Sequence, residues 1–499
     1  MLELYDYTIV KSVRALCPRC FANDPDFDPE YPTDICDGHL VERDGKIYLR
    51  RFCRRGHGEV WSLYEERADL WRYLQQWRVP TKIINPDTQA IYPVPMGYEH
   101  GLGPTHLQHS CIFLLDITTQ CNLSCPACYA HSSPENSLYL PLDAALHAVD
   151  TAIARENGRL DVVMLSGGEP TVHPQFRELL AALVERPVTR ILINTNGIRL
   201  ANDDAFLDLL HRHRDRAEVY LQYDGQRAST HETLRGMDLT ATKARAVQRL
   251  SDARIFTTLV MTVTNENADQ VGEVLDTCFG TPYVGGAMFQ PVFASGRAPA
   301  FDPMARVTTT GVLGRMEAQS RNGVRAHDLI ALPCSHPDCC SIGYWLKNKD
   351  GSIRSVASIV GEDALKANLS VFGNSIAFSD GLSQVHNALL GLMSETMTLS
   401  RPELVGHLKD LCAACDLGGL TGLLKLAFGR DATASFVGER VKRVTVKHFM
   451  DADTLITERL EQCCVHVGGA GNDPVRMPFC AARLFPKVRD RANQGMATR

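Results

Sequence analysis

Apolar and polar positions in the middle of the 499-residue chain follow two alternating rhythms. Short, nearly continuous apolar runs fit strands that are buried on both faces, and each run is followed by a longer segment with helical spacing of its apolar residues. Such a strand–helix order predicts a parallel sheet with right-handed crossovers. The predicted strands are 111–121, 160–168, 190–197, 217–225, 255–264 and 286–292, and the predicted helices are 141–157, 173–186, 203–214, 240–253 and 269–280.

The six strand–helix units fit an α/β fold, a partial (β/α)6 barrel of the TIM type. Polar and Gly-rich residues follow the strands, so functional residues are expected at the C-terminal ends of the strands. The segments on either side differ from the barrel in being rich in Cys. The chain is expected to divide into a Cys-rich domain at 1–75, a Pro-containing linker at 76–105, the barrel at 106–300, a connector at 301–330 and a second Cys-rich domain at 331–499.

Composition excludes several classes of function. The chain has 52 Lys and Arg against 58 Asp and Glu, a net charge of −6, so no nucleic-acid partner is expected. The first residues lack the basic and apolar regions of a signal peptide, and no apolar run reaches the roughly 20 residues that span a bilayer. A cytoplasmic location is therefore predicted. In that reducing compartment the 17 Cys are better metal ligands than disulfide partners.

Three of these cysteines form a tight group after the first predicted strand. Cys121, Cys125 and Cys128 have x3 and x2 spacing and are followed by Tyr129. A cubane iron–sulfur cluster normally takes four Cys ligands, so three thiolates leave one iron open to another ligand. An open coordination position is typical of a reactive metal site.

This three-cysteine loop on such a barrel resembles the radical S-adenosylmethionine superfamily. The resemblance implies that a 4Fe-4S cluster binds S-adenosylmethionine and that a 5′-deoxyadenosyl radical abstracts hydrogen from a C–H bond. The motif Gly167-Gly168-Glu169-Pro170 ends the second strand, where Glu169 would accept from the ammonium of the cofactor. Cofactor binding is expected to involve Tyr129, Gly167, Gly168, Glu169, Pro170, Asn196 and Asp224, with Cys121, Cys125 and Cys128 as the catalytic cluster ligands.

The N-terminal cysteines have the spacing of a two-knuckle tetrahedral metal site. Cys17 and Cys20 form the first knuckle, and Cys53 with His57 forms the second. Cys36 competes with His57 for the fourth position, and the spacing does not choose between them. Three Cys and one His suit zinc, whereas four thiolates suit a rubredoxin-like iron, so one mononuclear Fe or Zn is predicted.

The C-terminal cysteines are numerous enough for one or two auxiliary 4Fe-4S clusters. Their density beyond the barrel argues against eight unrelated structural thiols. The predicted ligands are Cys334, Cys339, Cys340, Cys412, Cys415, Cys463, Cys464 and Cys480.

A closer resemblance spans nearly the whole chain. The Cys-Pro-x-Cys knuckle, Gly296-Arg297, the run 333–340, the segment 448–451 and the final Pro-Phe-Cys occur in the order found in the tetraether synthase family and its bacterial relatives. Some members of that family have been labelled pterin methyltransferases. The family resemblance implies a rubredoxin-like domain, a radical barrel, an auxiliary-cluster domain and coupling of two lipid chain ends. Val446-Lys447 departs from the family pattern and leaves the ligand set of the auxiliary cluster open.

Coupling two unactivated lipid carbons, for membrane-spanning lipid synthesis, is therefore the first predicted function. The alternatives are a radical methyltransferase acting on a pterin-like small molecule and a peptide-modifying radical maturase. The expected partners are a lipid or small-molecule substrate and an electron donor such as flavodoxin or ferredoxin. A lipid substrate would also bring the protein into peripheral contact with a membrane.

Overall fold

The computed structural model describes most of the predicted barrel and parts of both Cys-rich segments. Most of the predicted linker, together with Cys334, Cys412 and Cys415, lies outside the described residues. The described residues are 6–23, 35–77, 83–84, 91–92, 110–156, 158–298, 301–332, 335–348, 350–362, 438–469, 476–485 and 497–498.

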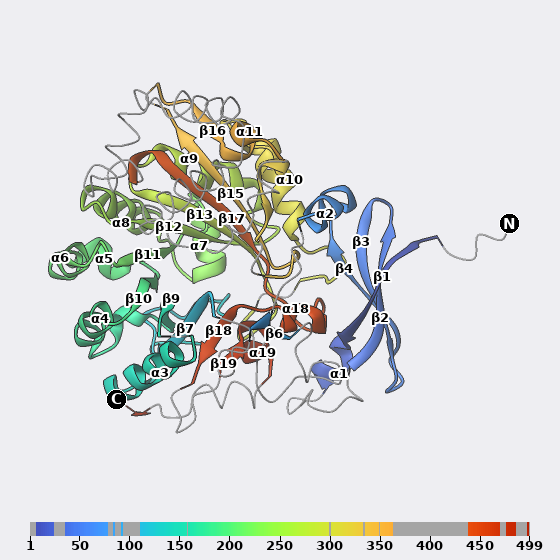
Figure 1. The fold of residues 1–499 in the computed structure, drawn as a ribbon, viewed down its shortest axis with the longest axis horizontal. Helices are drawn as coiled ribbons and strands as arrows, with labels where there is room; N and C mark the ends of the chain where they lie inside the picture. The colour runs from blue at the N-terminus through green and yellow to red at the C-terminus, as the bar shows by residue number, and fades with distance from the viewer. Residues whose placement is uncertain are drawn as a thin grey trace.

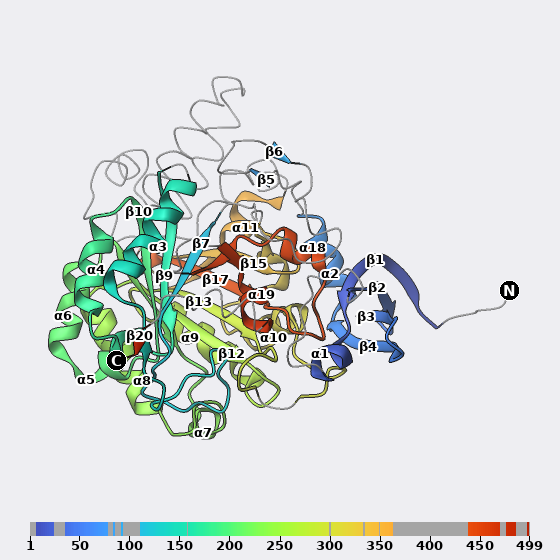
Figure 2. The same cartoon turned by 90° about the horizontal axis from the view of Figure 1, so that it is seen from below.

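A four-stranded antiparallel sheet forms the N-terminal part of the chain and stands beside the barrel (Figures 1 and 2). Its central hairpin turns at Asp44 and Gly45, which both have positive φ and so give the turn a twist that matches the strands. Leu40, Leu49 and Trp71 share one core cluster on the inner face. The elements are β1 (Thr8–Leu16), α1 (Pro18–Asn23), β2 (Ile35–Arg43), β3 (Lys46–Cys53), β4 (Gly58–Glu65) and α2 (Ala68–Gln75).

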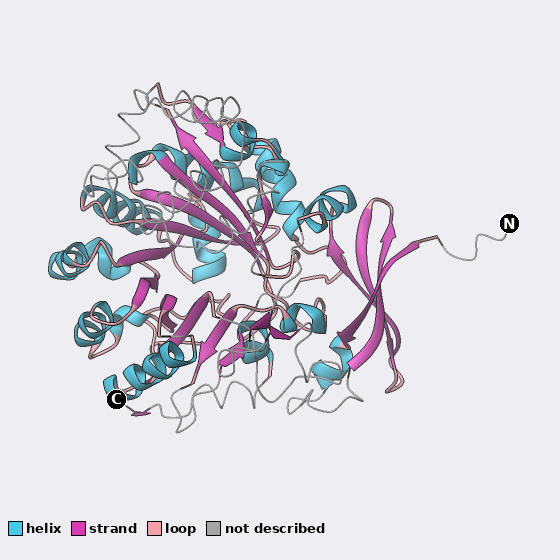
Figure 3. Ribbon diagram, in the orientation of Figure 1, coloured by secondary structure: helices cyan, strands magenta, loops and turns pink. Residues whose placement is uncertain are grey.

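Six parallel strands form the barrel sheet in the order in which they follow one another along the chain, with helices on the outside (Figure 3). This arrangement confirms the α/β fold and all six predicted strands, because each apolar run was long enough to be buried on both faces. The strands are β7 (Ile112–Thr118), β9 (Leu160–Gly167), β10 (Val188–Thr195), β11 (Ala217–Gln222), β12 (Thr257–Val263) and β13 (Val284–Pro291).

The helices between these strands agree with the predicted helical segments. Short elements that the sequence pattern did not indicate lie between them, such as α5 and α7. The helices are α3 (Leu142–Arg155), α4 (Phe176–Val184), α5 (Ile198–Asn202), α6 (Asp204–Arg212), α7 (Ala228–Arg235), α8 (Thr240–Asp252), α9 (Val271–Gly280) and α10 (Thr309–Gln319), with 3-10 turns at Pro170–Val172, Ala268–Gln270 and Ala326–Asp328.

Each barrel strand contributes one side chain to an apolar layer inside the barrel. The layer fills the interior below the strand ends and leaves the C-terminal ends of the strands for the functional groups. Its members are Ile112, Val162, Leu192, Tyr220, Val260 and Met288.

Strands from the C-terminal part of the chain extend the barrel sheet at both edges. β17 pairs in parallel with β13 and antiparallel with β15, while β18 pairs in parallel with β7 at the opposite edge. The C-terminal segment therefore shares one sheet with the barrel. The additional elements are β8 (Leu138–Tyr139), β14 (Ile330–Ala331), β15 (Cys340–Lys347), β16 (Ile353–Ser355), α11 (Val356–Val360), β17 (Val441–Lys447), α18 (Thr457–Glu461), β18 (Val465–Gly468), β19 (Arg476–Pro478), α19 (Phe479–Leu484) and β20 (Ala497–Thr498), with a separate pair β5 (Ile83–Ile84) and β6 (Ile91–Tyr92).

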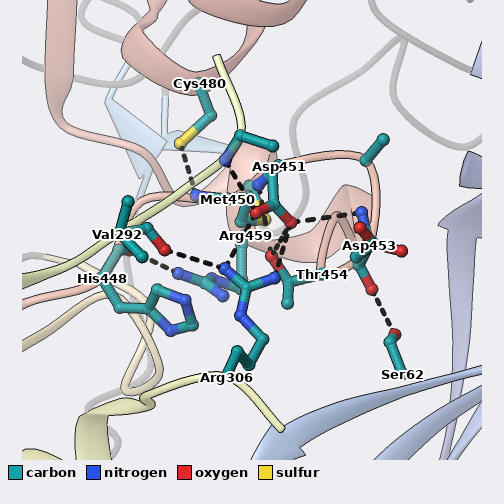
Figure 4. A network of polar contacts seen from close by, with 12 residues as sticks. Ser62, Val292, Arg306, His448, Met450, Asp451, Asp453, Thr454, Arg459 and Cys480 are labelled. Atoms are coloured by element: carbon teal, nitrogen blue, oxygen red, sulfur yellow. Dashed lines mark hydrogen bonds and ion pairs between the residues drawn. The ribbon is translucent and has the colours of Figure 1, made fainter. Parts of the chain in front are cut away.

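Buried charges hold the loop after β17 against the barrel (Figure 4). Arg306 and Asp451 are fully buried and form two hydrogen-bonded contacts of 2.9 and 2.8 Å. The Asp451 carboxylate also accepts from the Ala294 amide at 3.0 Å. Because a buried charge is costly without partners, these contacts fix the register of the loop on the barrel.

The N-terminal sheet is tied to the same region through Asp338, which precedes two of the C-terminal cysteines. Asp338 is buried and accepts from the Tyr64 hydroxyl at 2.7 Å, the Trp71 indole at 3.0 Å and the Gln75 amide at 2.6 Å. The sheet thereby positions the Cys339 segment.

Among the described residues, no helix combines the length and apolar character needed to cross a membrane.

Burial of Glu65 predicts a pH-dependent stability. Glu65 is buried and accepts from the Thr310 amide and hydroxyl at 2.8 and 2.7 Å, and burial raises its pKa to about 7. Because the pKa of Glu65 is higher in the folded than in the unfolded state, its protonated carboxyl contributes its full stabilisation below the unfolded pKa. That stabilisation is lost as pH rises through 7. The free energy of unfolding should fall by up to about 3 kcal/mol between pH 4.5 and 7 from this group.

Glu65→Gln should flatten that profile, because Gln keeps an acceptor oxygen and does not titrate. Thermal unfolding of the anaerobic protein between pH 5 and 8 measures it. The matched control is Glu66→Gln, since the half-buried Glu66 pairs with Arg315 at 3.1 Å and should lower stability without flattening the profile. An unchanged slope in Glu65→Gln would contradict the assignment.

Candidate active site

The three cysteines of the predicted cluster loop meet in one cavity at the C-terminal ends of the barrel strands. This radical cavity, as it is called below, has a volume of about 880 Å³ including its open mouth. Cys121, Cys125 and Cys128 all line it. The predicted cofactor residues that also line it are Tyr129, Gly167, Gly168, Glu169 and Asn196, whereas Pro170 and Asp224 are not among its lining residues.

The cysteine loop is clamped from the side by the residues that follow β13. Cys128 and Arg297 exchange backbone hydrogen bonds of 2.7 and 2.9 Å, and the Arg297 guanidinium donates to the carbonyls of Cys125 and Ser132. Gly296 has φ +60°, and a Cβ there would lie 2.4 Å from the Cys128 carbonyl oxygen. Arg297 was missed as a site residue because it binds the loop backbone and carries no ligand atom.

The Gly-Gly-Glu segment approaches the start of the loop equally closely. A Cβ on Gly167 would lie 2.2 Å from the Thr118 carbonyl oxygen, and one on Gly168 would lie 2.1 Å from that of Gln120. Hydrogen bonds from the amides of Gly168 and Glu169 to these two carbonyls, of 2.7 and 2.9 Å, close the contact. Glycine is required here because two backbones touch.

Glu169 is buried and heavily hydrogen bonded. Its Oε1 accepts from the hydroxyls of Thr171 and Thr195 at 2.6 and 2.7 Å, and its Oε2 accepts from the Asn196 amide at 2.7 Å. Burial raises the pKa of Glu169, and these donors act against that effect. The carboxylate is thus fixed in orientation at the edge of the radical cavity, with Oε2 left to accept from a cationic ligand.

Asn196, which follows β10, links the end of that strand to the cysteine loop. Its side-chain amide donates to Asn122 Oδ1 at 2.6 Å, one residue after Cys121. The loop is therefore held by backbone contacts on two sides and by a side-chain contact on a third.

Asp224 forms an ion pair beside the radical cavity. It is fully buried and forms two contacts of 2.6 and 2.8 Å with Arg235, whose side chain does line the radical cavity. Burial acts to raise the pKa of Asp224, but the charge and hydrogen bonds of Arg235, together with the charge of Lys243, outweigh it and hold the pKa below its usual value. Arg235 was not predicted, since its ion pair crosses from α7 to the end of β11 without a local sequence signal.

The environment of the Cys121 and Cys125 thiols suits them to bind a metal. Burial raises the pKa of Cys121 to about 12 and also raises that of Cys125. Such thiols stay neutral without a cation and ionise on a metal, so metal binding releases their protons. Three converging thiols beside a fixed carboxylate fit a cluster with one iron left for an additional ligand.

Polar side chains from neighbouring strand ends form the floor of the radical cavity. Tyr129 and Ser166 share a hydroxyl contact of 3.0 Å, Asn194 donates to Ser166 at 3.2 Å, and Gln222 donates to Asn194 at 2.8 Å. The row continues to Arg235, whose guanidinium donates to Gln222 at 3.3 Å. This floor can orient hydrogen-bonding groups of a bound molecule.

The N-terminal knuckles converge as a second cluster of ligand atoms. The donor atoms of Cys17, Cys20, Cys53 and His57 all lie within 4.8 Å of one another. The His57 Nδ1 atom is 3.3 Å from the Cys20 sulfur and 3.5 Å from that of Cys53. A hydrogen bond from Cys36 lowers the pKa of Cys17 to about 4, so Cys36 is adjacent to this group but outside it.

A second cavity, here named the cysteine cavity, lies between the C-terminal segments and has a volume of about 520 Å³. Apolar side chains such as Leu332 and Leu460 form much of its wall. Of the eight predicted auxiliary ligands, the five that the structure describes all line it: Cys339, Cys340, Cys463, Cys464 and Cys480.

Comparison with known proteins agrees with this geometry. Residues 115–278 match the family model of the radical SAM superfamily. The 7,8-dihydro-6-hydroxymethylpterin dimethyltransferase of Methanocaldococcus jannaschii is 24% identical over 94% of this chain and 92% of that protein. The sporulation killing factor maturation protein SkfB of Bacillus subtilis is 29% identical over 48% of this chain, which spans 59% of SkfB.

Among solved structures, SuiB of Streptococcus suis bound to S-adenosylmethionine is 16% identical, with coverage of 37% of this chain and 41% of SuiB and a TM-score of 0.33. The family match spans the strands that carry the three-cysteine loop, Glu169 and Asn196. A 4Fe-4S cluster and S-adenosylmethionine are the cofactors that this match implies. The chain contains a radical SAM domain, and the protein is an enzyme of the radical SAM superfamily.

Proposed function

We propose that the enzyme joins two unactivated carbons of lipid chains. The observation that carries the proposal is the contact between the two cavities, because aromatic side chains that line the radical cavity pack against others in the wall of the cysteine cavity. A long alkyl chain gains free energy from every methylene group that it buries in such a wall, by about 0.8 kcal/mol each.

The cofactors would supply a 5′-deoxyadenosyl radical, which removes a hydrogen atom from a C–H bond. Cys121, Cys125 and Cys128 hold the cluster, and the Arg297 clamp keeps their backbone in place. The close approach at Gly168 holds the start of the cysteine loop, while Glu169 is placed to accept from an ammonium group. Coupling breaks two C–H bonds, passes one hydrogen atom to each of two deoxyadenosyl groups and forms one C–C bond.

The remaining metal sites extend this proposal. Five cysteines in one cavity exceed the four ligands of a cubane cluster, which supports at least one auxiliary 4Fe-4S cluster there. The site formed by Cys17, Cys20, Cys53 and His57 supports one mononuclear zinc or iron. Reductive cleavage of the cofactor also requires a one-electron donor such as flavodoxin or ferredoxin.

Methyl transfer to a pterin-like molecule is the second candidate function. It is favoured by the relative named as a pterin dimethyltransferase, which aligns with nearly the whole chain. The amides of Asn194, Gln222 and Gln290 at the radical cavity would also suit a heterocycle with several hydrogen-bonding groups. This candidate would produce S-adenosylhomocysteine and a methylated product.

Cys125→Ala should abolish coupled lipid products, because it removes one of three cluster ligands. Lipids from an anaerobic host that expresses the wild-type chain would be hydrolysed and analysed by mass spectrometry for chains of twice the mass less two hydrogen atoms. These chains should appear only with the intact loop. If purified wild-type enzyme forms S-adenosylhomocysteine and a methylated pterin and no coupled chain in the presence of lipid, the coupling function is wrong.

Arg297→Ala should speed the loss of the cluster by about tenfold or more, as expected when a group that orients metal ligands is removed. The measurement is the decay of the visible cluster absorbance of the anaerobic enzyme after addition of a chelator. Arg186→Ala is the matched control, because Arg186 pairs with Asp150 on the surface, far from the cavity. Equal decay in both variants would show that the clamp does not stabilise the cluster.

His57→Ala should lose the N-terminal metal, whereas Cys36→Ser should keep it, since only His57 belongs to the converging group. Metal content per chain by mass spectrometry, with electron paramagnetic resonance for high-spin ferric iron, reports both the occupancy and the identity of the metal. Retention in His57→Ala together with loss in Cys36→Ser would reverse the ligand assignment.

A further inference from the structure

One buried arginine reaches the cysteine cavity and contacts a predicted cluster ligand directly. Arg459 in α18 is 1% exposed and lines the cavity, and its Nε donates to the Cys339 sulfur at 3.3 Å. Charge-assisted hydrogen bonds are roughly twice as strong as those between neutral groups. The contact therefore favours the thiolate of Cys339, which is the form of cysteine that binds a metal.

A closed ring of contacts holds the guanidinium in this position. Nη2 of Arg459 donates to the His448 carbonyl at 2.7 Å, and the His448 amide donates to the Cys339 carbonyl at 2.9 Å. Two residues further along, the Met450 amide donates to the Cys480 sulfur at 3.3 Å (Figure 4). Arg459 and the segment 448–450 together therefore place N–H groups on two sulfurs of the cysteine cavity.

The charge of Arg459 has no ion-pair partner in the part of the chain that the structure describes. The Asp338 carboxylate acts on it through charge alone, because three donors from β4 and α2 occupy the oxygens of that carboxylate. Nη1 of Arg459 is buried and has no hydrogen-bond partner among the described residues. A buried charge is costly unless it is paired, so the thiolates of the cysteine cavity are left to supply the counter-charge.

The arginine beside the radical cavity is paired differently. Arg235 acts on the Cys125 thiol through its charge and a hydrogen bond, but its guanidinium also makes two contacts of 2.6 and 2.8 Å with the buried Asp224. A carboxylate thus neutralises the positive charge next to the three-cysteine loop. The charge of Arg459, in contrast, remains available to the thiols of the cysteine cavity.

We propose that Arg459 is a positioning residue of the auxiliary cluster and raises its reduction potential through the hydrogen bond to Cys339. The inference rests on the auxiliary cluster proposed for the cysteine cavity and does not depend on the substrate. A core of charge 2+ with four thiolates carries two net negative charges. One electron from a donor of the flavodoxin or ferredoxin class, which is oxidised, takes the core to 1+ and adds a third. The guanidinium offsets one of these charges and so favours the reduced cluster, because the potential depends on net charge and on hydrogen bonds to the sulfurs.

The test measures this potential in the full chain without its radical cluster. Cys121→Ala, Cys125→Ala and Cys128→Ala combined remove the ligands of that cluster. Acid-labile sulfide and the electron paramagnetic resonance of the reduced, anaerobically reconstituted protein then report the auxiliary cluster. In this background Arg459→Met should lower the ratio of reduced to oxidised cluster at a fixed potential by about tenfold or more, a shift of about 59 mV or more to lower potential. Arg459→Lys keeps the charge and should change the ratio by less than about threefold.

Arg190→Met is the matched control for the loss of a buried arginine. Arg190 in β10 donates to the Asp215 carbonyl at 3.3 Å and lines neither cavity, so its replacement should lower stability and leave the potential unchanged. Equal potentials in Arg459→Met and Arg190→Met would overturn the inference. An absence of acid-labile sulfide would overturn it as well, because no cluster would then occupy the cysteine cavity.

A second readout decides the matter even where Arg459→Met takes up no cluster. In the same background, arginine labelled with nitrogen-15 should give a nitrogen-15 hyperfine coupling to the reduced cluster, and Arg459→Lys should abolish it. No coupling to labelled arginine, or a coupling that persists in Arg459→Lys, would contradict the contact with the cluster. None of these measurements uses a substrate, so their outcome is separate from that of the proposed coupling of lipid chains.

Discussion

The site depends on backbone contacts that leave no room for a side chain. The cysteine loop lies between the Gly167-Gly168 pair on one side and Gly296 on the other, and a Cβ at any of these glycines would overlap a carbonyl oxygen of the loop or of the strand end before it. Arg297 and Asn196 then fix the loop by hydrogen bonds. A cluster with an open iron has only three Cys ligands. The backbone contacts and hydrogen bonds therefore hold the three thiols in place without a fourth cysteine.

Strand pairing and buried hydrogen bonds link the more distant parts of the molecule. Strands from the C-terminal segment close both edges of the barrel sheet, so the cysteine cavity is built beside the radical cavity. The N-terminal sheet reaches this region through buried polar contacts, with Asp338 receiving three donors from β4 and α2. These contacts therefore join the described members of all three groups of clustered cysteines in one folded unit.

The barrel could be predicted from sequence because burial on both faces leaves a strong local pattern in each strand. The cysteine loop and the Gly-Gly-Glu motif could be predicted because their spacing encodes contacts within a few residues. The partners of Asp224 and of the loop could not be predicted, because Arg235 and Arg297 act through contacts between separate elements. Gly296-Arg297 belongs to the family resemblance, but no local pattern shows what the Arg297 side chain binds.

We propose that the loop of Cys121, Cys125 and Cys128 holds a cluster whose open iron faces Glu169. The most direct measurement is pulsed electron–nuclear double resonance on the reduced enzyme with S-adenosylmethionine carrying nitrogen-15 in its amino group. A strong nitrogen-15 hyperfine coupling is expected, and it should weaken in Glu169→Gln, because the carboxylate orients the ammonium group. A reduced cluster that shows no coupling to the labelled nitrogen in the wild-type enzyme would contradict it.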